Sequence, residues 1–138
     1  MKTLIALLIL SQLSSADYVN NGDGTITNEI TQTIWQDQSH TIDTQDTWNS
    51  AINYCEALVI GTNSNWRLPT INELISFIDY TNYNPTINDA FQYKSSADGY
   101  WSSTTAQTKT EAWFVDFEEG DTGSVDKASS LYIRCVSN

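Results

Sequence analysis

The sequence predicts an α+β domain, with two helices packed on one side of antiparallel strands and hairpins. A hairpin signal stands near the start, between residues 18 and 27. Two segments with helical spacing of apolar residues follow between residues 46 and 80, and the chain beyond residue 100 has the character of strands. A length of 138 residues suits one domain with a substantial core, and 12% aromatic residues exclude a disordered chain.

Residues 1–16 have the pattern of a secretory leader, in which Lys2 precedes an apolar run over 3–10 and small residues occupy 14–16. The run is shorter than the roughly 20 apolar residues that cross a bilayer, and no cysteine follows it for a lipid anchor. A membrane-retained or buried N-terminal helix is the alternative. We expect export and cleavage, which leaves residues 17–138 as a single domain without a membrane span. That domain would be secreted, periplasmic or held at a bacterial cell surface.

The composition is acidic, with 17 Asp and Glu residues against six Lys and Arg, and cleavage would also remove Lys2. The formal net charge is −11 for the whole sequence, and the basic residues are scattered. Nucleic acid and anionic membranes require a basic surface. We therefore expect neither as a partner.

The hairpin signal depends on Asn-Gly and Asp-Gly pairs at residues 21–24, which supply the positive φ angles of a tight turn. The same residues suggest a calcium loop. With Gly24 in the glycine position of an EF-hand, however, Val19 and Ile30 would stand where acidic ligands are required. The turn is the better interpretation. A second short strand is expected over 30–35, then a polar loop in which His40 is a surface side chain.

Two helices follow. The first is capped by Asp46 or Thr47 and ends before Gly61, and its apolar face consists of Trp48, Ala51, Ile52, Cys55 and Leu58. The second begins with a capping box, Thr70 to Glu73, just after Pro69. We expect it to end near Tyr80, with a buried stripe of Ile71, Leu74, Ile75 and Ile78.

A loop is expected from Thr81 to Ala97, followed by strands over 100–105, 112–117, 124–127 and 131–136. In the second of these strands, Trp113, Val115 and Phe117 alternate with Phe114 and Asp116, which predicts one buried face.

Cys55 and Cys135 are the cysteines of the chain. In an exported protein such a pair usually forms a disulfide. A redox or metal site is the other interpretation, but the wide spacing, the absence of a Cys-x-x-Cys motif and the single histidine disfavour it.

Motifs along the chain occur in a recognisable order: Asn-Gly-Asp-Gly-Thr-Ile-Thr at 21–27, Trp-Arg-Leu-Pro-Thr-Ile-Asn-Glu-Leu at 66–74, Tyr-Trp-Ser-Ser-Thr at 100–104 and Tyr-Ile-Arg-Cys-Val at 132–136. Together they resemble the bacterial Lcl C-terminal domain family, which is named after a collagen-like adhesin. The resemblance covers nearly all of residues 17–138.

This resemblance implies a fold similar to C-type lectin-like domains, in which a cysteine of the first helix is commonly tied to one on the final strand. Cys55 and Cys135 occupy those places. The calcium-binding triplets of sugar-binding C-type lectins are missing around Pro85 and Trp113. The family's adhesin is associated with sulfated glycosaminoglycans, which need basic contacts that this composition does not supply. The Arg-Leu-Pro-Thr segment also resembles one in formylglycine-generating enzymes, whose additional reactive cysteine pair is absent here.

The strongest motif has structural roles in our interpretation. Trp66 would fill the core, Glu73 would cap its own helix, and Arg67 would pair with an inward carboxylate such as Asp79 or Asp116. Likewise, Trp101 would lie in a core strand in which the hydroxyls of Ser102 and Ser103 satisfy backbone groups.

Candidate binding residues lie in or beside the long loop, where rings could stack on sugars and amides could bind hydroxyls: Tyr80, Asn82, Tyr83, Asn84 and Tyr93. The alternative is that these tyrosines cover the core as a lid. The turn that carries Asp116, Glu118, Glu119 and Asp121 offers hard oxygens to a calcium ion, although such a turn is usually only solvated. No other cofactor is expected.

The sequence thus favours a non-catalytic recognition or adhesion module that binds glycan or cell-surface protein. A structural subunit that assembles with its own copies or with envelope proteins is the alternative. An enzyme is not expected, because no nucleophile, base and orienting group can be named together.

Overall fold

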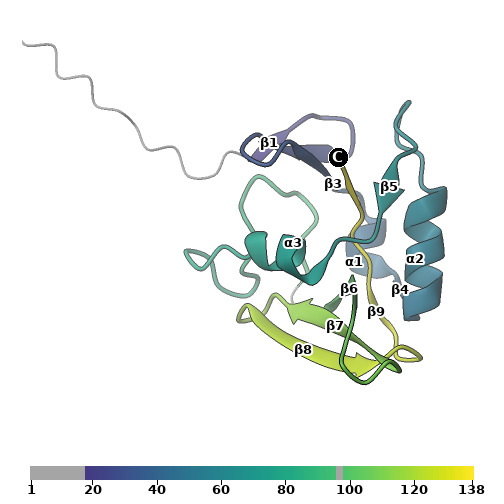
Figure 1. The fold of residues 1–138 in the computed structure, drawn as a ribbon. Helices are drawn as coiled ribbons and strands as arrows, with labels where there is room; N and C mark the ends of the chain where they lie inside the picture. The colour runs from purple at the N-terminus through teal and green to yellow at the C-terminus, as the bar shows by residue number, and fades with distance from the viewer. Residues whose placement is uncertain (1–17, 96–97) are drawn as a thin grey trace, which may run out of the picture.

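The computed structural model describes residues 18–95 and 98–138 (Figure 1). The expected leader therefore lies outside the described residues, as do the last two residues of the expected loop from Thr81 to Ala97. In chain order the elements are β1 (Tyr18–Asn20), β2 (Thr25–Asn28), β3 (Thr33–Gln36), α1 (His40–Asp43), β4 (Gln45–Asp46), α2 (Trp48–Ala57), β5 (Trp66–Arg67), α3 (Ile71–Ser76), β6 (Tyr100–Thr105), β7 (Glu111–Asp116), β8 (Asp121–Asp126), β9 (Leu131–Tyr132) and β10 (Val136–Ser137). The prediction of an α+β domain is confirmed. No helix within the described ranges is both long enough and apolar enough to span a membrane.

The strands of the described chain form two sheets, ordered β1-β2-β3-β10-β5 and β4-β9-β6-β7-β8. β1 and β2 make the predicted hairpin, with Gly22 and Gly24 at φ angles of 74° and 85°. β6, β7 and β8 form an antiparallel meander, while β6 and β9 pair in parallel. The C-terminal strand β10 is inserted between β3 and β5, so the end of the chain completes the first sheet.

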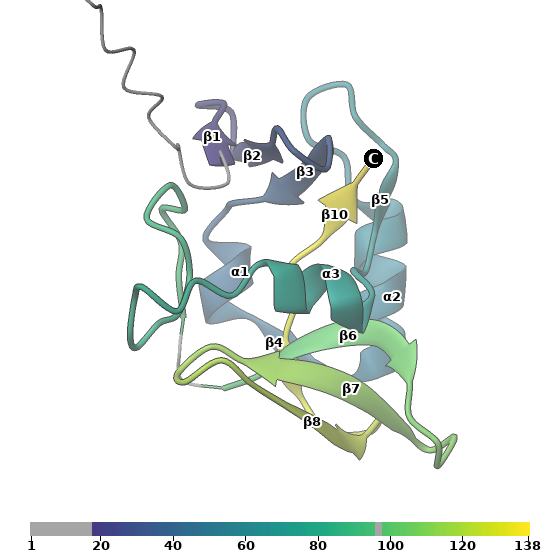
Figure 2. The same cartoon turned by 60° about the vertical axis from the view of Figure 1, so that its left-hand side comes forward.

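The final segment was expected to form one strand over 131–136. Instead β9 and β10 belong to different sheets, and the chain between them runs from one sheet to the other (Figure 2). Ile133, Arg134 and Cys135 on this connection are almost fully buried. Their backbone crosses the interior, so it cannot continue the pairing of a single sheet.

Cys135 on this connection forms a disulfide with Cys55 of α2, with the Cα atoms 5.5 Å apart. The predicted bridge is confirmed. It lies in a core cluster with Trp66, Leu68 and Trp101, and the predicted core position of Trp66 is confirmed. Ser102 is also fully buried and donates from its hydroxyl to the Trp113 carbonyl at 2.6 Å, as its expected role requires.

Both helices form where the sequence places them, but both end early. α2 ends at Ala57, and Gly61 lies instead in a turn that links Ile60 and Asn63. α3 has the predicted capping box and ends at Ser76, before Tyr80. Phe77, just after the helix, is 1% exposed while Ile75 within it is 42% exposed, so the prediction that Ile75 is buried was wrong.

Two further expectations were wrong. The segment expected to be a polar loop contains α1 and β4, and His40 is not a free surface side chain, because its ring stacks on Tyr54 with the centroids 4.1 Å apart. In β7, Val115 is buried as predicted, and so is Phe117 just after the strand, but Trp113 is only half-buried and Ala112 takes the interior position. The pairing register of β6 with β7 shifts between Trp101 and Thr105, and this irregularity interrupts the alternation.

Candidate functional site

The segment from Asp79 to Asn88, here called the tyrosine loop, is held by its own hydrogen bonds. The backbone N–H of Asp79 donates to the Thr86 carbonyl at 2.8 Å. The Asp79 carboxylate accepts from the N–H of Thr81 at 3.0 Å, and the Asn82 amide donates to the Ile87 carbonyl at 2.9 Å. Asn82, one of the predicted ligand-binding residues, is therefore engaged in closing the loop.

The tyrosine loop is also bound to the turn between β7 and β8. The N–H and hydroxyl of Thr86 donate to the Phe117 carbonyl at 2.7 and 2.9 Å, and the N–H of Asn84 donates to the Glu118 carbonyl at 3.3 Å. Tyr80 lies across Gly120, donating from its hydroxyl to the Gly120 carbonyl at 3.3 Å. A Cβ atom on Gly120, whose φ is 81°, would stand 2.9 Å from the Tyr80 ring, so this contact requires glycine.

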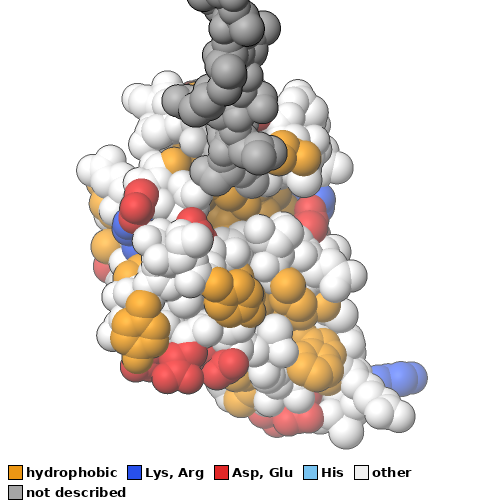
Figure 3. Space-filling view, turned by 90° about the vertical axis from the view of Figure 1, so that its left-hand side faces the viewer, with side chains coloured by type: hydrophobic (Ala, Val, Ile, Leu, Met, Phe, Trp, Pro, Cys, Tyr) orange, Lys and Arg blue, Asp and Glu red, His pale blue; other side chains and the backbone are white. Residues whose placement is uncertain are grey.

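Tyr80 and Tyr83, here called the tyrosine face, are 74% and 71% exposed despite this bracing. Figure 3 views a side of the molecule on which exposed hydrophobic side chains border Asp and Glu side chains. These two rings stand largely in solvent, whereas Phe77, Ile87 and Phe117 are buried, so the tyrosines do not pack over the core as a lid would. The structure therefore places two aromatic rings in solvent on a loop that is hydrogen-bonded to the β7–β8 turn, and the Tyr80 ring is itself held against Gly120.

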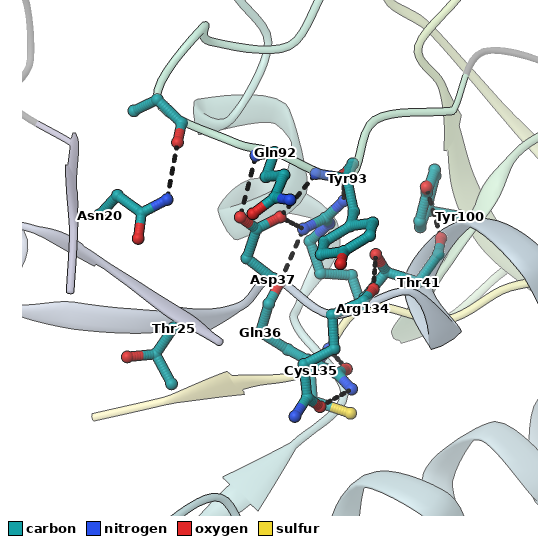
Figure 4. Close-up of polar contacts among 12 residues, drawn as sticks. Asn20, Thr25, Gln36, Asp37, Thr41, Gln92, Tyr93, Tyr100, Arg134 and Cys135 are labelled. Carbon is teal, nitrogen blue, oxygen red and sulfur yellow. Dashed lines mark hydrogen bonds and ion pairs between the residues drawn. The ribbon is translucent and has the colours of Figure 1, made fainter. Parts of the chain in front are cut away.

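Tyr93, predicted to act with these residues, is placed differently. Its backbone N–H donates to Asp37 at 3.0 Å and its carbonyl accepts from Arg134 (Figure 4). Its side chain is half-buried and borders a cleft formed with the β1–β2 turn and the segment after β3. The predicted binding group is thus divided into an exposed tyrosine face and a separate cleft that includes Tyr93.

The sequence interpretation missed a buried ion pair between Asp37 and Arg134, which are 4% and 1% exposed. The Arg134 guanidinium lies 3.4 Å from Asp37 and donates to the Gln36 carbonyl at 2.6 Å. It also packs over the rings of Phe77, Phe91 and Tyr100, at 5.1–5.6 Å from their centroids. The sequence does indicate that Arg134 is buried, because it stands between Ile133 and Cys135 in an apolar terminal segment.

Arg67 was expected to pair with Asp79 or Asp116, and this was wrong. It makes a two-point ion pair with Glu73, at 2.6 and 2.9 Å, because the capping box holds that carboxylate above the end of β5. The hydrogen bonds from Arg67 hold the pKa of Glu73 below its ordinary value, and the same bonds raise the pKa of Arg67. In this motif Arg67 is thus paired with the capping carboxylate of the following helix and not with a carboxylate from another part of the fold.

The acidic turn does not gather its carboxylates. Asp116 accepts from the N–H of Glu118 at 2.8 Å, while Glu118, Glu119 and Asp121 are exposed. Across the described residues, no three or more His, Cys, Asp or Glu side chains converge in a way that could hold a metal ion.

The family model described as the Lcl C-terminal domain matches residues 24–137. The chain belongs to the Lcl C-terminal domain family. Among curated proteins, none matches the sequence. The matched range of this Lcl C-terminal domain includes the tyrosine loop, the disulfide and most of the cleft, although Asn20 and Gly22 of the cleft precede it.

Proposed function

We propose that this Lcl C-terminal domain is an exported, non-catalytic recognition module, and that the tyrosine face binds glycan or protein at a bacterial cell surface. The observation that carries the proposal is the combination at Tyr80 and Tyr83 of more than 70% exposure with a loop bound to the β7–β8 turn. Loops fixed on a rigid scaffold are the usual place for binding residues.

Tyrosine suits this role physically. Its ring offers a large apolar face with few rotatable bonds, so little conformational entropy is lost when a partner orders it. A sugar ring stacks on such a face, and a protein surface packs against it, while the hydroxyl supplies a hydrogen bond. The bracing of Tyr80 across Gly120 lowers the ordering cost further, because that ring is already held.

The proposal that the domain is non-catalytic is supported by what its reactive groups do. Both cysteines are joined in the disulfide, so neither thiol is free. Arg67 and Glu73 bind each other, and His40 stacks on Tyr54.

Self-assembly into an envelope structure is the second candidate. β8 lies at one edge of its sheet and runs for six residues, so a second copy could pair with it. Antiparallel pairing of two β8 strands would bring Asp121 of one copy toward Asp126 of the other, and like charges in that position are destabilising. We therefore favour recognition.

The test uses the mature chain on immobilised glycans and bacterial surface proteins, with a Tyr80→Ala/Tyr83→Ala variant beside it. We expect the parent to bind a defined set and the variant to lose that binding while its melting curve is retained. A matched control is Val19→Ala/Ile30→Ala, which removes two other exposed hydrophobic side chains, 41% and 69% exposed. Equal binding by the tyrosine variant and the parent would contradict the proposal.

A further inference from the structure

A cleft of about 330 Å³ lies where three chain segments meet, away from the tyrosine face. Its walls come from the β1–β2 turn, the residues after β3 and the end of the long loop: Asn20, Gly22, Gly24, Asp37, Gln38, Ser39, Gln92 and Tyr93. Pockets that bind small molecules range over roughly 300–1,000 Å³, so this cleft has room for one small ligand.

The walls are fixed to one another. The N–H of Asp37 donates to the Gly24 carbonyl at 2.8 Å, which ties the residues after β3 to the turn. The Asp37 carboxylate accepts from the N–H groups of Gln92 and Tyr93 at 2.9 and 3.0 Å, which ties the long loop to the same residue (Figure 4). The cleft is therefore preformed, and a ligand would not have to order it.

The cleft offers no free charge. Asp37 is the charged residue among those that line it, and both of its oxygens are occupied by backbone N–H groups, with Arg134 beneath. In a chain with a net charge of −11, an anion would meet repulsion and no cation to offset it. For a cation, the carboxylate in this lining is that of Asp37, which is 4% exposed and already paired with Arg134.

The polar groups that remain are neutral amides and hydroxyls. The side chains of Ser39, Gln92 and Tyr93 make no hydrogen bond to any described residue, and Gln38 uses only its carbonyl oxygen, which accepts from Gln36 at 3.1 Å. Amides and hydroxyls both donate and accept hydrogen bonds. They are complementary to a ligand whose own groups do the same, which describes the hydroxyls of a sugar.

Gly24 explains how the amide of Gln38 is positioned. A Cβ atom on Gly24 would lie 3.1 Å from Cγ and 3.3 Å from Nε2 of Gln38, so the glycine leaves room for this side chain against the turn. A Cβ atom added to Gly22 would meet no atom within 4 Å, so the space beside this residue is open. The Asn-Gly-Asp-Gly motif thus forms both a turn and one wall of the cleft.

We propose that this cleft binds a single neutral sugar residue through the amides of Gln38 and Gln92 and the hydroxyls of Ser39 and Tyr93. The site is distinct from the tyrosine face, and either proposal can fail without the other.

The experiment is a titration of the isotope-labelled mature chain with neutral monosaccharides (glucose, galactose, mannose and N-acetylglucosamine) and with glucuronate, followed by amide chemical shifts. We expect at least one neutral sugar to shift the amides of Gly22, Gln38, Ser39 and Tyr93, and glucuronate to bind more weakly than glucose because of its carboxylate. Gln92→Ala and Tyr93→Phe each remove one hydrogen-bonding group and should weaken binding roughly threefold to tenfold.

Gln107→Ala is the matched control, because this glutamine is exposed on the β6–β7 connection and lies outside the cleft. It should bind as the parent does, and Tyr80→Ala/Tyr83→Ala should keep the cleft shifts. Three results would overturn the proposal: no cleft shift with any neutral sugar, stronger binding of glucuronate, or unchanged affinity in both Gln92→Ala and Tyr93→Phe.

Discussion

Replacing Asp37 with Asn should destabilise this domain more than any exposed acidic substitution. Asparagine keeps the shape but removes the charge that faces Arg134, which is 1% exposed and cannot be rehydrated in place. In the parent, the backbone N–H groups of Gln92 and Tyr93 donate to the Asp37 carboxylate. The NH₂ group of asparagine would face one of these donors and could not accept from it. Removing one partner of a buried ion pair costs about 3–5 kcal/mol. That is a large fraction of the roughly 5–15 kcal/mol that stabilises a typical domain.

The assay is urea unfolding of the oxidised protein, followed by the fluorescence of tryptophans such as Trp35 and Trp101, which are buried. Asp89→Asn is the control, because it makes the same chemical change in the exposed ion pair with Lys94, where the Asp89 side chain is 82% exposed. The control should cost no more than about 1 kcal/mol. Amide hydrogen exchange should also rise at Gln92 and Tyr93 in Asp37→Asn, since their acceptor is changed.

A double-mutant cycle with Arg134→Met separates the ion pair from other effects. The double variant should be more stable than the sum of the single effects predicts, by about 1–3 kcal/mol, because it leaves no unpaired buried charge. If Asp37→Asn costs no more than Asp89→Asn, or if the single effects add, the buried pair does not hold the long loop as we describe.

Three other predictions concern the disulfide, the capping box and the acidic turn. Changing Cys55 and Cys135 to Ala should lower the free energy of unfolding by about 4.5 kcal/mol, since the bridge closes a loop of 80 residues. If urea unfolding gives a difference between variant and parent of less than about 1 kcal/mol, this magnitude is wrong. Because the pKa of Glu73 is lowered in the folded state, its pair with Arg67 stabilises the domain above the ordinary value of 4.5 and loses this effect as the pH falls through the lowered pKa. Glu73→Gln should lower the free energy of unfolding by up to about 1 kcal/mol at neutral pH, since the pair is partly exposed, and by less in acid. An effect that does not change with pH would contradict a stabilising ion pair between Glu73 and Arg67. Millimolar calcium or a chelator should leave the melting temperature unchanged, because the carboxylates of residues 116–121 do not converge, whereas a rise with calcium would show a site there.

Local signals predicted much of the fold. The hairpin, the capping box and the helix that carries Cys55 depend on neighbouring residues, so their positions follow from turn chemistry and spacing. The path of the final segment could not be predicted in the same way. Whether Leu131 to Val136 stays in one sheet depends on what Ile133 and Cys135 pack against, which is a property of the tertiary structure.

The arrangement of the candidate site also depends on tertiary contacts that local sequence patterns do not predict. The exposed tyrosines were predicted from their place in an Asn-rich loop, and the structure agrees for Tyr80 and Tyr83. Tyr93 belongs to a different surface because Asp37, 56 residues earlier, accepts its backbone N–H. No pattern in the sequence pairs Asp37 with Arg134, which are separated by 97 residues, so the cleft that they support was not foreseen.

The most direct test of the recognition proposal is adhesion of the producing cells with Tyr80→Ala/Tyr83→Ala in place of the parent domain. Both rings are exposed, so their removal should leave the free energy of unfolding within about 1 kcal/mol of the parent. We expect adhesion to be lost while the purified variant melts as the parent does. Adhesion equal to that of the parent, at equal amounts of exported protein, would contradict it.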